Sequence, residues 1–400
     1  MLVAMLAAAY GVAQAVPAIS PTELVAPKVE VSGGNVNFTV QPSVLDRNYQ
    51  LQYSDTMATD SWHDLEVVKV GTGVNLVIST PYVPASAQRF YRLMLTVAPD
   101  PPAAPEGFSL IPAGSFSMGN ALSASGDGIT SGNSELPVHT VQMSAFYMGK
   151  YEVSKAQWDE VRTWGLTHNY TDLAVGSMSG TTNYSKGPTH PVHLITWYDT
   201  VKWCNARSEK ENLTPCYYTD AAQTLIYKTG STDINNTMVK WSANGYRLPS
   251  EAEWEKAARG GLSGKRFPWG DTITHSQANY YSRNTIAYDV SPTRGYHPTY
   301  KVNGMPYTSP VGSFAANGYG LYDMTGNISE WCWDWFSGSY YELLSGTDTH
   351  GIAEGSGRVS RGGDWGGYDA DPCRVAHRDD GPPGYTSLSF GFRVVRSTGP

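Results

Sequence analysis

The chain has 400 residues, of which 16% are charged and 40% hydrophobic, with 41 Gly, 25 Pro, 12 Trp and 26 Tyr. This length predicts two or three domains, and the low charge with many aromatic residues excludes a disordered chain. The net charge is −8 and the sequence has no Lys/Arg run, which excludes nucleic acid and anionic lipid as partners.

Residues 1–15 are almost entirely apolar or small and end in Ala13-Gln14-Ala15. This small-residue pattern is typical of a signal-peptidase cleavage site, although the usual basic start is missing. The stretch is too short to span a bilayer, and no later segment approaches a membrane span. We expect a signal peptide and a secreted or periplasmic protein, with an apolar N-terminal strand as the alternative.

Residues 22–97 show short runs of alternating polar and apolar residues separated by turn residues. Such runs, with no helical period between them, predict a small all-β sandwich of immunoglobulin or fibronectin type. We expect a spacer or adhesion domain, because no catalytic residue types cluster there. The predicted strands include Lys28–Ser32, Asn35–Val40, Tyr49–Tyr53 and Arg89–Leu93.

A proline-rich linker over residues 98–106 separates this domain from a second one over residues 107–397. The linker reads APDPPAAPE, and its four prolines favour an extended, stiff chain. Helices are predicted from residue 154, with Ser154 as N-cap, over 197–205 and over 249–259. After residue 259 the sequence indicates turns and short strands.

Four cysteines are too few for a disulfide scaffold, and none shows the CxxC spacing of zinc or thioredoxin-like sites. In an oxidising compartment they allow three pairings into two bridges. The pattern does not choose among them, and Cys204–Cys216 with Cys332–Cys373 is the preferred set.

Eight motifs in a fixed order over about 290 residues resemble the formylglycine-generating enzyme (sulfatase-modifying factor) family. The resemblance implies an α+β, C-type-lectin-like fold with little regular secondary structure. The motifs lie at residues 107–119, 137–153, 191–199, 246–255, 267–271, 317–331, 361–363 and 391–393.

The same resemblance implies calcium as a cofactor. At the first site Asp323 and Glu330 would donate side-chain oxygens, and Gly326 and Ile328 would donate carbonyls, as a hard cation requires. The second site maps to Asn279 and Asn303 by side chain, and to Tyr280 and Met305 by carbonyl. Asn303 stands where an acidic residue is usual, so we expect the second site to be weaker or empty.

Catalysis in the family uses a cysteine pair that binds Cu(I), for which thiolates are natural ligands. Here Gly367 occupies the first cysteine position, the second falls near Ala370, and Cys373 is displaced toward Arg374. Copper is therefore not expected. The remaining candidates for catalysis in this segment are Asp364, Cys373, His377 and Arg378.

Three functions follow from these residues. The favoured one is a secreted, non-catalytic, calcium-stabilised module that binds an extracellular peptide or glycan. The alternative is a divergent oxidoreductase of the formylglycine-generating enzyme family, acting on protein cysteine or another small thiol. The third is genuine sulfatase maturation, which the altered cysteine positions disfavour.

Overall fold

A computed structural model describes residues 27–40, 47–55, 63–70, 76–81, 89–97, 103–122, 134–177, 187–343, 348–367 and 369–398. The predicted signal peptide lies outside these ranges, as does part of the predicted linker. The chain divides into two compact units, one formed by Met1–Pro101 with Ala113–Ser115 and Gln142–Ser144, the other by the remaining residues. Within the described ranges, no helix is both long and apolar enough to cross a bilayer.

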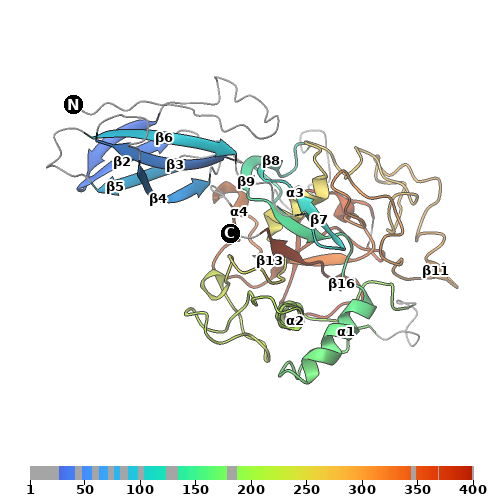
Figure 1. The fold of residues 1–400 in the computed structure, drawn as a ribbon. Coiled ribbons are helices and arrows are strands. Elements are labelled where there is room, and N and C mark those ends of the chain that lie inside the picture. Colours follow the sequence, from blue (N-terminus) through green and yellow to red (C-terminus); the bar gives the residue numbers. More distant parts are fainter. Residues whose placement is uncertain are drawn as a thin grey trace. The chain divides into compact units, whose positions relative to one another are not determined.

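The first unit contains two three-stranded antiparallel sheets, drawn from blue to cyan in Figure 1. Every second residue of β2 is buried, because successive side chains of a strand point to opposite faces. One hydrophobic cluster draws on both sheets, with the rings of Phe38 and Tyr91 5.3 Å apart. The sheets have the orders β1-β2-β5 and β4-β3-β6, from β1 (Lys28–Ser32), β2 (Asn35–Val40), β3 (Arg47–Ser54), β4 (His63–Val70), β5 (Leu76–Pro81) and β6 (Phe90–Val97).

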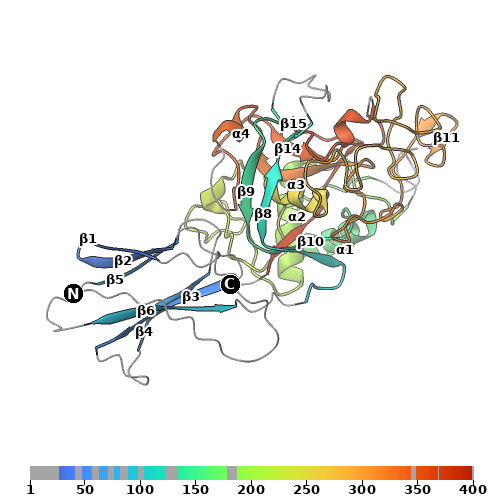
Figure 2. The same cartoon turned by 90° about the horizontal axis from the view of Figure 1, so that it is seen from above.

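The second unit has few helices and several small sheets. A four-stranded sheet has the order β15-β14-β13-β16, in which only β13 and β16 run parallel. The other sheets are β17-β10-β7, β8-β9 and β11-β12, and β8 and β9 lie side by side in Figure 2. The strands after residue 101, of which β8 and β9 each have some residues assigned to the first unit, are β7 (Phe108–Ile111), β8 (Gly114–Met118), β9 (His139–Met143), β10 (Phe146–Gly149), β11 (Lys301–Val302), β12 (Met305–Pro306), β13 (Ser329–Trp335), β14 (Arg358–Arg361), β15 (Asp379–Gly381), β16 (Phe390–Gly391) and β17 (Val395–Ser397).

Three helices of this unit begin where local capping predicts. Ser154, Thr196 and Ser250 each accept a hydrogen bond from the third residue of the helix, and that residue's side chain bonds back to the cap amide. The helix predictions are therefore confirmed. The helical elements are α1 (Lys155–Leu166), α2 (Trp197–Lys210), η2 (Asn236–Met238), α3 (Glu251–Arg259), α4 (Tyr340–Leu343) and η3 (Asp371–Cys373).

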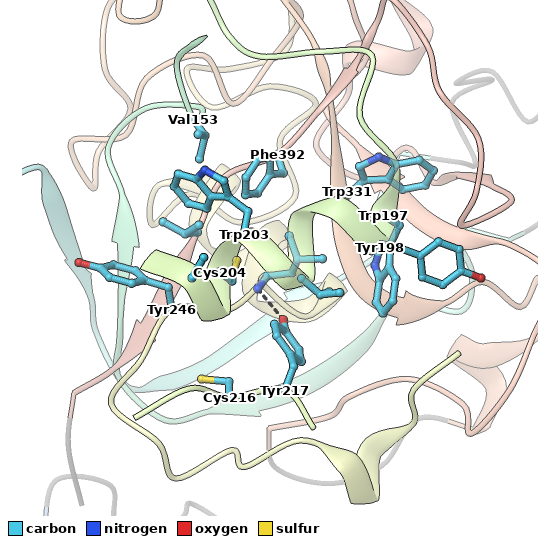
Figure 3. Packing of buried hydrophobic residues seen from close by; sticks show 14 of the residues in the cluster. Val153, Trp197, Tyr198, Trp203, Cys204, Cys216, Tyr217, Tyr246, Trp331 and Phe392 are labelled. Atoms are coloured by element: carbon cyan, nitrogen blue, oxygen red, sulfur yellow. Dashed lines mark hydrogen bonds between the residues drawn. The ribbon is translucent and has the colours of Figure 1, made fainter. Parts of the chain in front are cut away.

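Aromatic rings fill the space between the loops of this unit. Figure 3 shows Trp203 of α2 close to Phe392, and their ring centroids are 5.4 Å apart with the planes nearly perpendicular. The hydroxyl of Tyr217 accepts a hydrogen bond from the Leu248 amide at 2.8 Å, so a polar ring tip inside the core is satisfied. Large rings suit irregular backbone because each one excludes water from several loops at once.

The preferred disulfide pairing is wrong, because all four cysteines are free and buried. Cys204 and Cys216 belong to the aromatic core of Figure 3, where they pack as small apolar side chains. Cys332 and Cys373 lie in different hydrophobic clusters, so this pair does not form. Burial raises the pKa of the Cys216 thiol to about 12, so it stays protonated at neutral pH.

Candidate functional site

A buried carboxyl group stands in the turn that precedes β13. Asp323 adopts a positive φ of 55°, and the residue is only 6% exposed. Its Oδ2 atom accepts a hydrogen bond from the Gly312 amide at 2.5 Å, whereas Oδ1 has no partner. Burial raises the pKa of Asp323 to about 6, because the charged form loses its hydration.

A second buried carboxyl group, Glu152, reaches the same region from the segment between β10 and α1. Its Oε2 atom accepts a hydrogen bond from Asn327 Nδ2 at 2.7 Å, whereas Oε1 has no partner. Burial raises the pKa of Glu152 well above its usual value, and the charges of Asp323 and Glu330 add to this effect. Two acidic side chains therefore share one buried region, in which each of them has one carboxylate oxygen without a hydrogen-bond donor.

The third acid of the region, Glu330, already has a full set of partners. Arg393 donates to its Oε1 at 2.6 Å and to its Oε2 at 2.7 Å, and Trp254 donates to Oε2 at 2.7 Å. This ion pair is neutral overall, so it leaves the charges of Glu152 and Asp323 unbalanced. Buried charge of one sign is costly, so these two acids require either protons or an added cation.

Asn327 links Glu152 to Ser309, because its side chain donates to Glu152 Oε2 and accepts the Ser309 amide. Unpartnered oxygens here are Glu152 Oε1, Asp323 Oδ1 and the buried Ser309 hydroxyl, and the buried hydroxyl of Thr325, two residues after Asp323, also has no partner. Oxygen donors are those that calcium prefers, so these residues fit a calcium ion. Among the described residues, no three His, Cys, Asp or Glu side chains form a metal-binding group, so hydroxyls and carbonyls would have to complete the shell.

The residues predicted for the first calcium site lie together in one turn and the start of β13. Gly326 has a positive φ of 73°, and a Cβ at this position would lie 2.5 Å from the Asn279 carbonyl oxygen. The Gly326 carbonyl accepts a hydrogen bond from the Ile328 amide at 2.9 Å. Glycine is therefore required in the turn that carries Asp323 toward Glu330.

Glu152 is not among the ligands predicted from the sequence. The residue lies within a motif of the resemblance, but its distance along the chain from Asp323 hides the fact that the two charges influence each other in the fold. One local signal was available, because Glu152 directly precedes the apolar Val153 and the N-cap Ser154. An acid in a run of buried residues is unusual and often functional.

The residues predicted for the second calcium site are arranged differently. Asn279 is buried, and the Tyr280 carbonyl accepts a hydrogen bond from His275 Nε2 at 3.1 Å. Asn303 and Met305 lie in the exposed β11–β12 hairpin, where Asn303 takes a positive φ of 53°. The second predicted site therefore offers a cation fewer free oxygen ligands than the region of Asp323 does.

The C-terminal segment holds Cys373 in a buried position. The residue is 1% exposed and packs with Phe267 and Ala370, and burial raises the pKa of its thiol well above the usual value. A Cβ on Gly363 would lie 2.8 Å from the Pro372 carbonyl carbon, so the glycine is needed for this close approach. The thiol is therefore protonated and shielded from solvent.

Asp364 follows the Gly362-Gly363 pair at the end of β14. It is half-buried, and its Oδ1 atom accepts a hydrogen bond from the Gly366 amide at 2.7 Å. Burial raises the pKa of Asp364 to about 6, while hydrogen bonds from Gly366 and Ser389 act in the opposite direction. This carboxyl group can therefore change its protonation state near neutral pH.

His377 and Arg378 are held by acidic partners. His377 Nδ1 lies 3.5 Å from Asp371 Oδ2 and 3.6 Å from Glu135 Oε1. Arg378 donates to both carboxylate oxygens of Glu251, at 2.6 and 2.8 Å, and is almost completely buried. A guanidinium bound in this bidentate way positions the segment and has few donors left for a ligand.

Helix α3 carries two acids, Glu251 and Glu255, that face this segment at i, i+4 spacing. Glu255 binds Arg361 and Arg259, the latter at 2.6 Å, and also accepts the Gly119 amide at 2.8 Å. Glu251 lies 3.4 Å from Arg361 Nε in addition to its pair with Arg378. The result is an alternating row of buried charges that fastens β14 and the C-terminal segment to α3.

Replacing Asp334 by Asn, next to this row, is expected to make stability less dependent on pH. Burial and then the charge of Glu251 raise the pKa of Asp334 to about 8, and its Oδ2 atom accepts the Glu251 amide at 2.8 Å. In the unfolded chain the Asp334 carboxyl group ionises near pH 4. The free energy of unfolding of the parent protein therefore falls by about 1.4 kcal/mol per pH unit between about pH 4 and pH 8. Asn accepts the same bond without ionising.

Urea unfolding of both proteins at half-unit intervals from pH 5 to pH 9 measures this difference. The stability of Asp334→Asn relative to the parent should rise with pH and level off above about pH 8. A difference that stays constant across the range would contradict the raised pKa.

Residues 95–398 match the family model of the sulfatase-modifying factor enzyme 1-like domain. The chain belongs to the sulfatase-modifying factor family. It is 31% identical to the formylglycine-generating enzyme of Streptomyces coelicolor over 315 residues, 76% of this chain and 96% of that enzyme.

Two further relatives have other names. The chain is 34% identical over 263 residues to a protein of Paenibacillus barcinonensis named chaperone protein LppX, covering 64% of this chain and 82% of that one. Treponema denticola variable protein 1 is similar in structure, with a TM-score of 0.53, 28% identity, and coverage of 72% of this chain and 94% of that chain.

These findings confirm two predictions about the sulfatase-modifying factor domain. The family recognised from eight ordered motifs is correct. The fold class is also correct, since the structure is α+β with few helices and many small sheets. The roles of the individual site residues remain predictions.

Proposed function

We propose that this sulfatase-modifying factor domain is a secreted, non-catalytic, calcium-stabilised module that binds an extracellular peptide or glycan. The observation that carries the proposal is the state of the C-terminal segment. Its one cysteine, Cys373, is a buried thiol with a raised pKa, and the family resemblance places Gly367 at the first cysteine position. A linear Cu(I) site requires two accessible thiolates, and this segment supplies neither.

Two features support secretion and calcium binding. The apolar residues 1–15 support secretion. Glu152 and Asp323 would hold calcium through their unpartnered oxygens, joined by the hydroxyls of Ser309 and Thr325. A bound calcium ion would neutralise two buried acids and so order the turn before β13, without taking part in any reaction.

The second candidate function is a divergent oxidoreductase of the same family, acting on protein cysteine or another small thiol. The half-buried Asp364 favours it, because a carboxyl group with a pKa of about 6 can exchange a proton with a substrate at neutral pH. His377 and Arg378 contribute less to this candidate, because neighbouring acidic side chains already form ion pairs or close contacts with them.

Anaerobic titration of the reduced, full-length chain with Cu(I), followed by a formylglycine assay on a cysteine-containing peptide, tests the proposal. The enzyme of Streptomyces coelicolor is the positive control. We expect no stoichiometric copper binding and no turnover. Tight copper binding that is lost in Cys373→Ser, together with peptide turnover, would overturn the non-catalytic function; thiol oxidation that is lost in Asp364→Asn would establish the second candidate.

A further inference from the structure

Two loop segments in the orange part of the chain, before β11 in Figure 1, pair through a single antiparallel bridge. Ser282 and Gly295 exchange both backbone hydrogen bonds, at 2.8 and 2.9 Å. Antiparallel register then places Tyr281 opposite Tyr296, and their ring centroids are indeed 4.7 Å apart, edge to face. Both rings are half-buried, so each has a surface in contact with solvent.

The same bridge places two arginines opposite each other. Arg283 is exposed, its guanidinium lies 5.5 Å from the centre of the Tyr281 ring, and no acceptor in the described part of the chain binds it. Arg294 is 44% exposed and uses only Nη1, which donates to Ser282 Oγ at 2.9 Å and to Asp289 Oδ1 at 3.1 Å. Guanidinium donors on both strands therefore remain open to a ligand.

The exposed charge of this region is wholly positive. Between residues 280 and 307 the charged residues are Arg283, Asp289, Arg294 and Lys301, and the side chain of Asp289 is fully buried. Like charges that face each other across two strands are unfavourable, and the buried Asp289 carboxylate offsets this by pairing with Arg294 at 3.1 Å. In the part of the chain that the structure describes, no acid forms an ion pair with Arg283 or Lys301, so these two side chains keep a local positive charge on a chain of net charge −8.

We propose that Tyr281, Arg283, Arg294 and Tyr296 form a binding site for an acidic glycan. A guanidinium presents a planar fork that matches the two oxygens of a carboxylate or a sulfate ester. The tyrosine rings beside it offer flat apolar surfaces for the C–H face of a sugar, with hydroxyl groups at their edges. This site rests on the proposed function and specifies its glycan ligand, but it requires neither calcium nor the C-terminal segment.

An acidic glycan fits this patch better than a nucleic acid. Nucleic acid binding depends on many phosphate contacts along a groove, and two arginines with one nearby lysine supply few of them. The net charge of −8 also repels a dense polyanion at longer range. A saccharide with one acid group per sugar unit requires only the local pairing of guanidinium and anion.

Binding of the full-length chain to four immobilised probes tests this inference. The probes are a κ-carrageenan oligosaccharide, which carries sulfate esters only, a polygalacturonate oligosaccharide, a neutral maltooligosaccharide and a single-stranded oligothymidylate. We expect binding to at least one acidic glycan, and Arg283→Gln should weaken it about tenfold, as expected for loss of a charge-assisted hydrogen bond. Arg283→Lys should recover part of the affinity, and Tyr281→Leu should also weaken binding.

The matched control is Lys240→Gln, which removes one exposed positive charge elsewhere on the chain. It should leave glycan binding unchanged, and thermal unfolding should show that every variant folds. Preference for the sulfated or the carboxylated probe identifies which acid the site takes. No binding to either acidic glycan, an equal loss in Lys240→Gln, or stronger binding to oligothymidylate that Arg283→Gln abolishes, would each overturn the inference.

Discussion

Replacing Glu255 by Gln is expected to destabilise the sulfatase-modifying factor domain by about 3–5 kcal/mol, the usual cost of breaking a buried ion pair. Glu255 is completely buried and binds Arg361, Arg259 and the Gly119 amide. Gln keeps the shape of the side chain but removes the charge, so the buried Arg259 loses its counterion and Arg361 keeps only Glu251, 3.4 Å from its Nε. Urea unfolding followed by tryptophan fluorescence measures the change.

An exposed ion pair provides the matched control. Lys265 and Asp271 are 2.6 Å apart, and their side chains are 45% and 38% exposed. Asp271→Asn should therefore cost less than about 1 kcal/mol. If Glu255→Gln cost no more than this control, the row of charges along α3 would be incidental to the fold.

Removing the two unpartnered acids should abolish the response of the protein to calcium. For the parent protein, calcium at about 100 times its Kd should add about 2.7 kcal/mol of stability, which raises Tm by several degrees. In Glu152→Gln with Asp323→Asn, calcium should have no effect. Without calcium this variant should be more stable than the parent at pH 7, because Gln and Asn place no ionisable group in the buried region.

The sign of the pH dependence provides an independent check of the same site. Asp323 has a pKa of about 6 in the fold, above its value near 4 in the unfolded chain. In the absence of calcium its cost to stability should therefore grow from about pH 4 to about pH 6 and stay constant above that. Calcium should remove this loss, because it stabilises the charged form.

A control variant of equal charge change is Asp159→Asn with Glu160→Gln, on α1. These side chains are 49% and 66% exposed, so their neutralisation should alter neither the calcium response nor the pH profile appreciably. Scanning calorimetry with and without calcium, across pH 4 to 8, distinguishes the two pairs. A calcium response retained by the Glu152 and Asp323 variant would remove the basis for this calcium site.

Local features of this protein were predictable from sequence alone. Ser154 and Ser250 mark helix starts because a cap and its partners lie within three residues of one another. The strands of the first unit follow from alternation, because the side chains of a strand point to opposite faces in turn. The family follows from motifs whose order is a property of the chain itself.

Contacts between distant loops were decided only by the tertiary structure. The charge of Asp323 raises the pKa of Glu152, and Glu255 pairs with Arg361, across long stretches of irregular backbone in which no periodic pattern marks a partner. The four thiols likewise lie in three separate clusters, where aromatic packing, and no covalent bridge, holds the loops. Caps and strands depend on neighbours along the chain, whereas a buried charge is stabilised by whatever group the fold brings beside it.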